Sequence, residues 1–154
     1  YTPTHTLSLH DALPICNDVL AHEMTHLIVN RFVRRRLPLW LNEGLAEWYE
    51  LFGYSAYKGI KKSERAAFDR SSDLYPVDAL LALPSYPSGD EAVRRFYFTA
   101  RSLVGFLRTD HAPETFHGFI REVFGGSGVT ESLKKHYEWE SVDAMVEDFT
   151  DFMD

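Results

Sequence analysis

The sequence predicts a mainly α-helical protein, and three observations support that prediction. Apolar residues recur every three or four positions through most of the chain, which is the spacing that lines one face of a helix. Proline and glycine divide these segments into lengths typical of helices. No stretch alternates apolar and polar residues as a half-buried strand would. The chain has 154 residues, of which 45% are hydrophobic, so residues 16–154 are long enough for one domain with a core.

A proline separates the first two predicted helices. Asn17 is a favourable N-cap residue, so we expect the first helix to begin there and to reach about Arg34. Pro38 cannot continue that helix because it has no backbone N–H. The second helix is expected over Leu39–Phe52, with Gly53 ending it.

The rest of the chain adds shorter helices and two loops. The helices are expected over Lys58–Arg70, Asp78–Leu83, Asp90–Arg108, Pro113–Phe124, Thr130–Tyr137 and Ser141–Phe152. Loop-forming residues cluster at Arg70–Asp73 and, most clearly, at Pro84–Gly89. The second loop has the composition of a flexible lid, and it is equally compatible with a simple connector.

The first fifteen residues differ from the rest of the sequence. The string Thr6–Ile15 looks like the translation of a common sequencing-library adaptor. We therefore expect residues 1–15 to be a non-native, disordered segment, with the natural sequence beginning near Cys16; a natural extended segment is the alternative. For this reason His5 and His10 are not counted as candidate ligands.

Charge and hydropathy exclude several classes of partner. With a net charge of -7, the chain is a poor candidate for binding nucleic acid or an anionic membrane. No apolar run approaches the length of a membrane span. Four arginines cluster near the end of the first predicted helix: Arg31, Arg34, Arg35 and Arg36. A solvated helix end is the simpler interpretation of this cluster, and a patch for an anionic partner is the alternative.

The segment His22-Glu23-Met24-Thr25-His26 reads H-E-x-x-H within the first predicted helix. Residues four apart share a helix face, so His22 and His26 can bind one metal ion with Glu23 beside them. Zinc is the metal that this set of ligands favours. The neighbouring residues are uncharged, which suggests a helix that is buried on most sides. Two core histidines without a metal are the alternative, which leaves Glu23 unexplained.

A catalytic zinc site has three protein ligands, so a third must come from another element. The second predicted helix offers Glu43 in the string Trp40-Leu41-Asn42-Glu43-Gly44, and Glu47 follows one turn later. Glu50 lies on the same stripe of the helix, and we interpret it as a solvated side chain.

Together, H-E-x-x-H and W-L-N-E-G resemble the gluzincin metallopeptidases, which include thermolysin-like proteases and the aminopeptidase N family. The resemblance covers residues 19–50. It implies that His22, His26 and Glu43 bind zinc and that Glu23 is the general base. It also implies that Glu47 hydrogen-bonds a ligand histidine and so orients its ring.

The same resemblance sets expectations for the fold and the reaction. Sixteen residues separate His26 from Glu43, slightly fewer than in thermolysin, and this spacing is closer to a looser group of uncharacterised bacterial gluzincin-like domains. Gluzincins place a small sheet before the H-E-x-x-H helix, and we expect that sheet to be missing from this chain. Tyr97 is the candidate for stabilising the oxyanion, because a similarly placed tyrosine serves in the aminopeptidase N family.

The sequence thus predicts a zinc-dependent peptidase that acts on a peptide or protein substrate. Zinc lowers the pKa of a bound water molecule, and a neighbouring carboxylate such as Glu23 can take up the proton. Two alternatives stay open: a gluzincin-fold module that binds zinc without catalysis, and an inactive fragment of a peptidase.

Overall fold

The computed structural model describes residues 9–57, 68 and 73–154. Within these residues it contains seven helices and no strand, so the prediction of a mainly helical protein is confirmed. The helices are α1 (Leu9–Phe32), α2 (Leu39–Tyr57), α3 (Val77–Ala82), α4 (Asp90–Thr109), α5 (Pro113–Phe124), α6 (Val129–Tyr137) and α7 (Val142–Met153).

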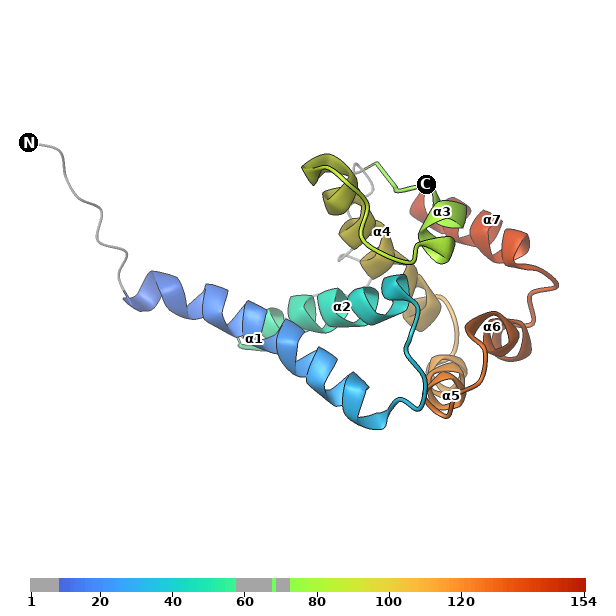
Figure 1. The fold of residues 1–154 in the computed structure, drawn as a ribbon, viewed down its shortest axis with the longest axis horizontal. Coiled ribbons are helices and arrows are strands. Elements are labelled where there is room, and N and C mark those ends of the chain that lie inside the picture. Colours follow the sequence, from blue (N-terminus) through green and yellow to red (C-terminus); the bar gives the residue numbers. More distant parts are fainter. Residues whose placement is uncertain (1–8, 58–67, 69–72) are drawn as a thin grey trace, which may run out of the picture.

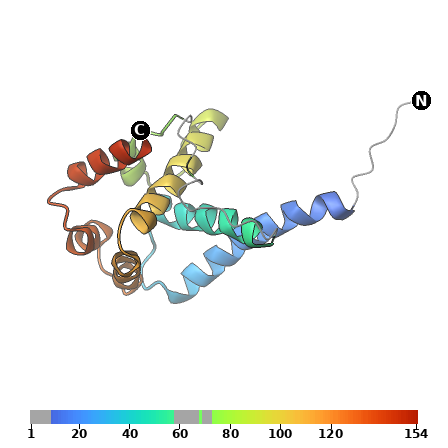
Figure 2. The same ribbon diagram turned by 180° about the vertical axis from the view of Figure 1, so that it is seen from behind.

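Two helix pairs organise the molecule. The chain turns after α1, and α2 runs back alongside it, so that α1 packs on one side of α2 (Figure 1). On its other side α2 packs against α4, and α5 and α6 form a second pair beside the lower end of α4 (Figures 1 and 2). The helix α2 is therefore central, since it contacts both the histidine-bearing helix and the main core helix.

The core lies between α2, α4 and the helices that follow. Trp40, Leu41, Leu45 and Trp48 bury one face of α2, and nearly the whole second half of α4 is buried against it. The ring of Phe106, on α4, packs in this core against the rings of Trp139 and Phe149. This packing holds α2 rigidly and leaves its other face free to meet α1.

The first helix departs from the prediction at its N-terminal end. It begins at Leu9, not at Asn17, so residues 9–15 belong to the helix. Asp11, Ala12 and Leu13 can all be accommodated in a helix, and Asn17 is then an interior residue with no cap to form. Residues 1–8 lie outside the described part of the chain.

The second helix also runs past its predicted end. It continues through Gly53 to Tyr57, because one glycine in a helix interior costs only about 1 kcal/mol and does not by itself end the helix. The helix predicted over Lys58–Arg70 and most of the loop Arg70–Asp73 fall outside the described residues. The remaining predicted helices are present as α3–α7; their ends differ by at most one residue, and α5 has the predicted bounds.

The prediction that α1 is buried on most sides is wrong. Large apolar side chains on this helix are between 45% and 66% exposed: Val19, Leu20, Met24, Leu27, Ile28 and Phe32. Among residues 19–32, whose burial is described, Val29 alone is buried. A segment without charged residues can be buried, but the elements that pack beside the helix decide how much of its surface is buried. No helix in the part of the chain that the structure describes is both long and apolar enough to cross a membrane.

Candidate metal centre

Helix α1 places His22 and His26 on the face that meets α2. Their rings are 4.8 Å apart, at 74° to one another, as expected for side chains four residues apart on a helix. Their Nε2 atoms lie 3.1 Å apart, and both side chains are only 16–18% exposed. Two ring nitrogens therefore converge on one point between the helices.

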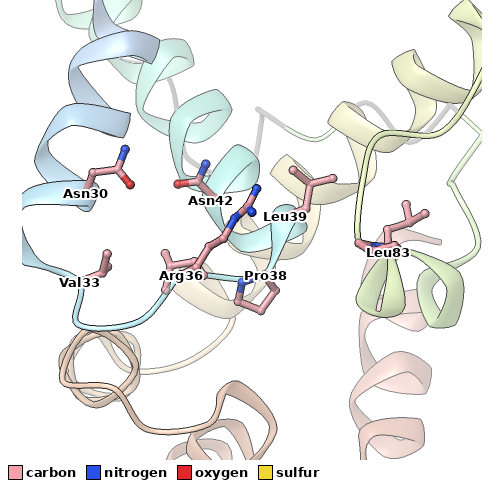
Figure 3. A pocket seen from close by; sticks show the side chains of 9 residues that line it. Asn30, Val33, Arg36, Pro38, Leu39, Asn42 and Leu83 are labelled. Atoms are coloured by element: carbon pink, nitrogen blue, oxygen red, sulfur yellow. The ribbon is translucent and has the colours of Figure 1, made fainter.

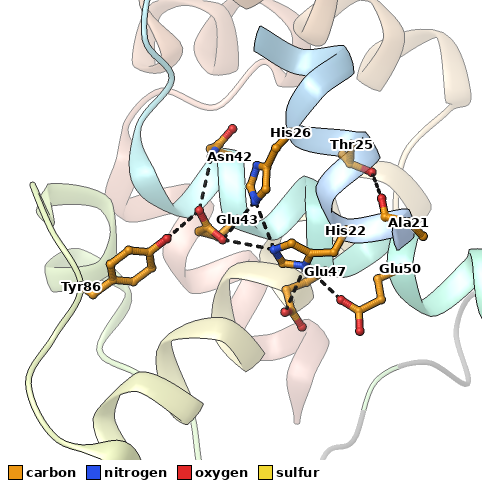
Figure 4. A network of polar contacts seen from close by, with 9 residues as sticks. All are labelled: Ala21, His22, Thr25, His26, Asn42, Glu43, Glu47, Glu50 and Tyr86. Carbon is orange, nitrogen blue, oxygen red and sulfur yellow. Dashed lines mark hydrogen bonds and ion pairs between the residues drawn. The ribbon is translucent and has the colours of Figure 1, made fainter. Parts of the chain in front are cut away.

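Helix α2 contributes Glu43 to the same point. Its carboxyl group is buried, and its Oε2 atom lies 3.6 Å from Nε2 of His22 and 3.5 Å from Nε2 of His26. Figure 4 shows the three side chains directed toward one another across the boundary between α1 and α2. The apolar neighbours Trp40, Leu41 and Leu45 fix the rotation of α2 about its own axis, and this rotation directs Glu43 toward the histidines.

The three atoms form a triangle with edges of 3.1, 3.5 and 3.6 Å. Ligands bound about 2.0–2.1 Å from a tetrahedral zinc ion lie about 3.3 Å from one another. The three groups thus have the spacing and the donor types of a two-histidine, one-carboxylate zinc site.

The other ring nitrogen of His22 faces carboxylates farther along α2. Glu50 accepts a hydrogen bond from Nδ1 of His22 at 2.9 Å, while Oε1 of Glu47 lies 3.6 Å from the same atom. With the proton on Nδ1, the lone pair of Nε2 is available to a metal. The interpretation of Glu50 as a solvated residue is therefore wrong, because a partly buried histidine packs against it. The contact of Glu50 with His22 could not be predicted from local spacing, because the two residues are 28 positions apart.

Glu47 nevertheless stands close to His22, as expected for a residue one turn from Glu43. Burial is the main cause that raises the pKa of Glu47, and the nearby charge of Glu50 raises it further. Glu47, Glu50 and Nδ1 of His22 also make up a second group of metal-compatible atoms. The first group contains two imidazoles and a buried carboxylate, so it is the better match to zinc.

Two donors hold the far oxygen of Glu43. The hydroxyl group of Tyr86 donates a hydrogen bond to Oε1 at 2.8 Å, and the amide of Asn42 donates a longer one at 3.3 Å (Figure 4). Oε1 is thereby occupied, and Oε2 is left for the histidine side. Burial and the bond to Glu43 both raise the pKa of Tyr86, so its hydroxyl stays protonated and remains a donor.

Tyr86 is a site residue that the sequence did not reveal. It lies in the connection between α3 and α4, within the predicted loop Pro84–Gly89, and it is 43 residues from Glu43. An aromatic residue in an otherwise small and polar loop was the only available signal. The prediction of a loop was right, but which residues the loop touches depends on how α4 crosses α2.

Gly44 explains why α2 can approach α4 so closely beside the site. A Cβ atom at this position would lie 2.5 Å from the carbonyl oxygen of Ala100 and 2.7 Å from a methyl group of Val104. Gly105 on α4 is equally tight against Trp48 of α2. The glycine of the W-L-N-E-G string therefore serves helix packing, which in turn positions Glu43.

The two predicted catalytic residues lie at the edges of this cluster. Glu23 is exposed and forms neither a hydrogen bond nor an ion pair with any residue that the structure describes. Tyr97 packs beside Tyr86, with ring centroids 6.0 Å apart. Burial is the main cause that raises the pKa of Tyr97; a hydrogen bond with Tyr86 lowers it in part, and the charges of Glu43 and Glu47 raise it. Tyr97 is thus near the carboxylates, and its catalytic role stays a prediction.

Comparison with known proteins finds no relative. No protein-family model, no curated protein and no solved structure matches this chain. The case for its function therefore rests on the motifs and on the geometry described above.

Proposed function

We propose that this protein is a zinc-dependent peptidase of the gluzincin type, with His22, His26 and Glu43 as the zinc ligands. The observation that carries the proposal is the triangle of two imidazole nitrogens and one carboxylate oxygen, which matches the ligand spacing of tetrahedral zinc. Each of these residues also occupies the position that the H-E-x-x-H and N-E-G strings require.

Bound zinc would polarise a peptide carbonyl group and make a water molecule acidic enough to react near neutral pH. Glu23 is the residue that would hold the proton released from that water, because it is adjacent to His22 and no described residue engages its carboxylate. It would then deliver the proton to the amine of the leaving group.

The remaining residues of the cluster orient and support the ligands. Glu50 and Glu47 keep the Nδ1 proton on His22, so that its Nε2 atom stays basic. Tyr86 and Asn42 hold Glu43 from the opposite side. Tyr97 would stabilise the oxyanion, and its position beside Tyr86 and near Glu43 is compatible with that role.

The proposal is tested with the substitution Glu23→Gln. Peptide hydrolysis is measured with a mixed peptide library by mass spectrometry, and bound zinc is measured on the same protein by elemental analysis. We expect hydrolysis to fall by about 100-fold or more while zinc stays bound, because the change removes only the general base. Glu147→Gln on α7, which is exposed and remote in sequence, is the matched control.

A module that binds zinc without catalysis would use the same three ligands but would not need Glu23. It predicts bound zinc together with no hydrolysis of any library peptide by the unaltered protein. Equal hydrolysis by the Glu23→Gln and unaltered proteins would also reject the assigned mechanism.

A further inference from the structure

A cavity of about 540 Å³ is lined by residues that follow or adjoin the proposed metal ligands in the chain (Figure 3). The residues that line it come from or directly adjoin three elements that also contribute to the metal centre: α1, α2 and the connection between α3 and α4. Asn30 comes from α1, one turn after His26, and Val33 directly follows the end of that helix. Asn42, whose amide bonds Glu43, comes from the start of α2. Asn42 thus connects the wall of the cavity to the proposed ligand Glu43.

The third wall belongs to the connection that leads to Tyr86. Leu83 and Pro84 line the cavity, and Tyr86, two residues farther on, bonds Glu43. Glu23 and Asn30 are seven residues apart on α1, which is about two helical turns, so both lie on the same edge of that helix. The lining residue Asn30 thus lies on the edge of α1 that carries the proposed general base.

Arg36 provides the only charged side chain among the residues that line this cavity. It is exposed, and it forms no ion pair with a described residue. In Figure 3 its guanidinium group extends from the connection between α1 and α2 toward Asn42. The arginines of this cluster were interpreted as a solvated helix end, but α1 ends at Phe32 and has Arg31 in its last turn. Arg36 lies four residues beyond, so it does not serve as that end charge.

The backbone adds to the positive character of the cavity. Leu39, the first residue of α2, lines it, and the first turn of α2 contains no acidic side chain. The nearest carboxylate on α2 is that of Glu43, which follows the first turn and accepts hydrogen bonds from Asn42 and Tyr86. A cation and the N-terminal end of a helix line the same cavity, in a chain whose net charge is -7. The charge of this local region is therefore opposite in sign to the net charge of the protein.

We propose that this cavity binds a carboxylate group of the peptide substrate and that Arg36 is the residue that recognises it; the inference rests on the proposed peptidase function. A guanidinium group binds a carboxylate with two parallel hydrogen bonds, and the amides of Asn30 and Asn42 are further donors on the walls. The carboxylate is either the C-terminal group of the peptide or the side chain of an aspartate or glutamate near the cleaved bond. The preferred substrates are thus acidic at a residue next to the scissile bond, or are cleaved close to their C-terminus.

Binding is the first test, because it does not depend on turnover. The zinc-loaded Glu23→Gln protein is titrated by calorimetry with a neutral hexapeptide amide, with the same peptide bearing a free C-terminus, and with amides in which one glutamate is moved along the sequence. We expect at least one carboxylate peptide to bind about ten-fold more tightly than the neutral amide. Which peptide does so identifies the source of the carboxylate.

The assignment to Arg36 is tested by adding Arg36→Gln, which should abolish the preference, and Arg36→Lys, which should retain part of it. Arg31→Gln is the matched control, since it makes the same charge change on α1 but does not line the cavity, and the preference should survive. Equal binding of all peptides, or an unchanged preference in Arg36→Gln, would overturn the proposal.

The same peptides are then given to the unaltered protein to separate this inference from the peptidase function. A carboxylate preference in binding without cleavage of any peptide would reject the peptidase and leave the cavity assignment standing. Cleavage that is indifferent to the carboxylates would reject the cavity assignment and leave the peptidase standing.

Discussion

The two faces of α1 differ in composition and in burial. The face toward α2 carries His22, His26 and Val29, which are partly or fully buried. The opposite face carries large apolar residues that are about half exposed, among them Leu20 and Leu27. In this helix the polar, metal-compatible side chains are better covered than the aliphatic ones.

This reversal shows that contacts, not hydropathy, set the environment of a residue. His22 and His26 are covered because α2 offers three carboxylates opposite them, so that burial leaves few polar atoms unsatisfied. Leu27 is exposed because no helix in the described part of the chain reaches that side of α1. Substitutions on the buried face should therefore have large effects, and substitutions on the exposed face should have small ones.

The largest effect is expected from His22→Ala on the buried face. It removes a proposed ligand, so the zinc content of the purified protein should fall from about one ion per chain to nearly none. His117→Ala on α5 makes the same chemical change at an exposed position and should leave the zinc content unaltered. Zinc retained at full occupancy in His22→Ala would show that the ligands are elsewhere.

Next in size is the effect of Glu50→Gln on metal affinity. Loss of this carboxylate removes the acceptor that orients His22, so zinc should bind about 10- to 100-fold more weakly in competition with a chelator. Glu47→Gln should have a smaller effect, because its carboxylate lies farther from the same nitrogen, at 3.6 Å compared with 2.9 Å. A larger effect from Glu47 would restore the role that the family resemblance gives it.

Gly44→Ala tests the packing that supports the buried face. Its Cβ would meet the backbone of Ala100 at 2.5 Å, which only a shift of α2 or α4 can relieve. We expect a loss of about 1–3 kcal/mol in the free energy of unfolding, measured with urea. Gly128→Ala is the control, since a Cβ there has only ordinary contacts. Equal stability of the two variants would mean that α2 and α4 do not approach closely at this glycine.

The smallest effect is expected from Leu27→Ala on the exposed face of α1. A side chain that is 64% exposed should contribute less than about 0.5 kcal/mol to the free energy of unfolding. Val29→Ala removes a smaller side chain from the buried face, yet it should cost about 2 kcal/mol because that side chain is 4% exposed. Thermal denaturation of the two variants compares the faces directly, and a higher cost for Leu27 would show that its face is covered in solution.

The sequence by itself indicated the mainly helical fold, most of the helix ends in the described residues, and the candidate metal ligands His22, His26 and Glu43. These features depend on local spacing, which the chain displays: residues four apart share a face, and proline or glycine interrupts the pattern. The pairing of His26 with Glu43 could be predicted because the H-E-x-x-H and W-L-N-E-G strings resemble those of the gluzincin metallopeptidases, and this resemblance implies that both residues bind one metal ion.

Only the tertiary structure decided which side chains surround that triangle. Tyr86 is 43 residues from its partner Glu43, and Glu50 is 28 residues from its partner His22. Contacts between residues so far apart in the sequence cannot be predicted from local spacing. Arg36 lines the adjoining cavity and Leu27 is exposed because of where α2 and its neighbours lie against α1. The direction in which a helix face points depends on which helices pack beside it, and local spacing cannot supply that information.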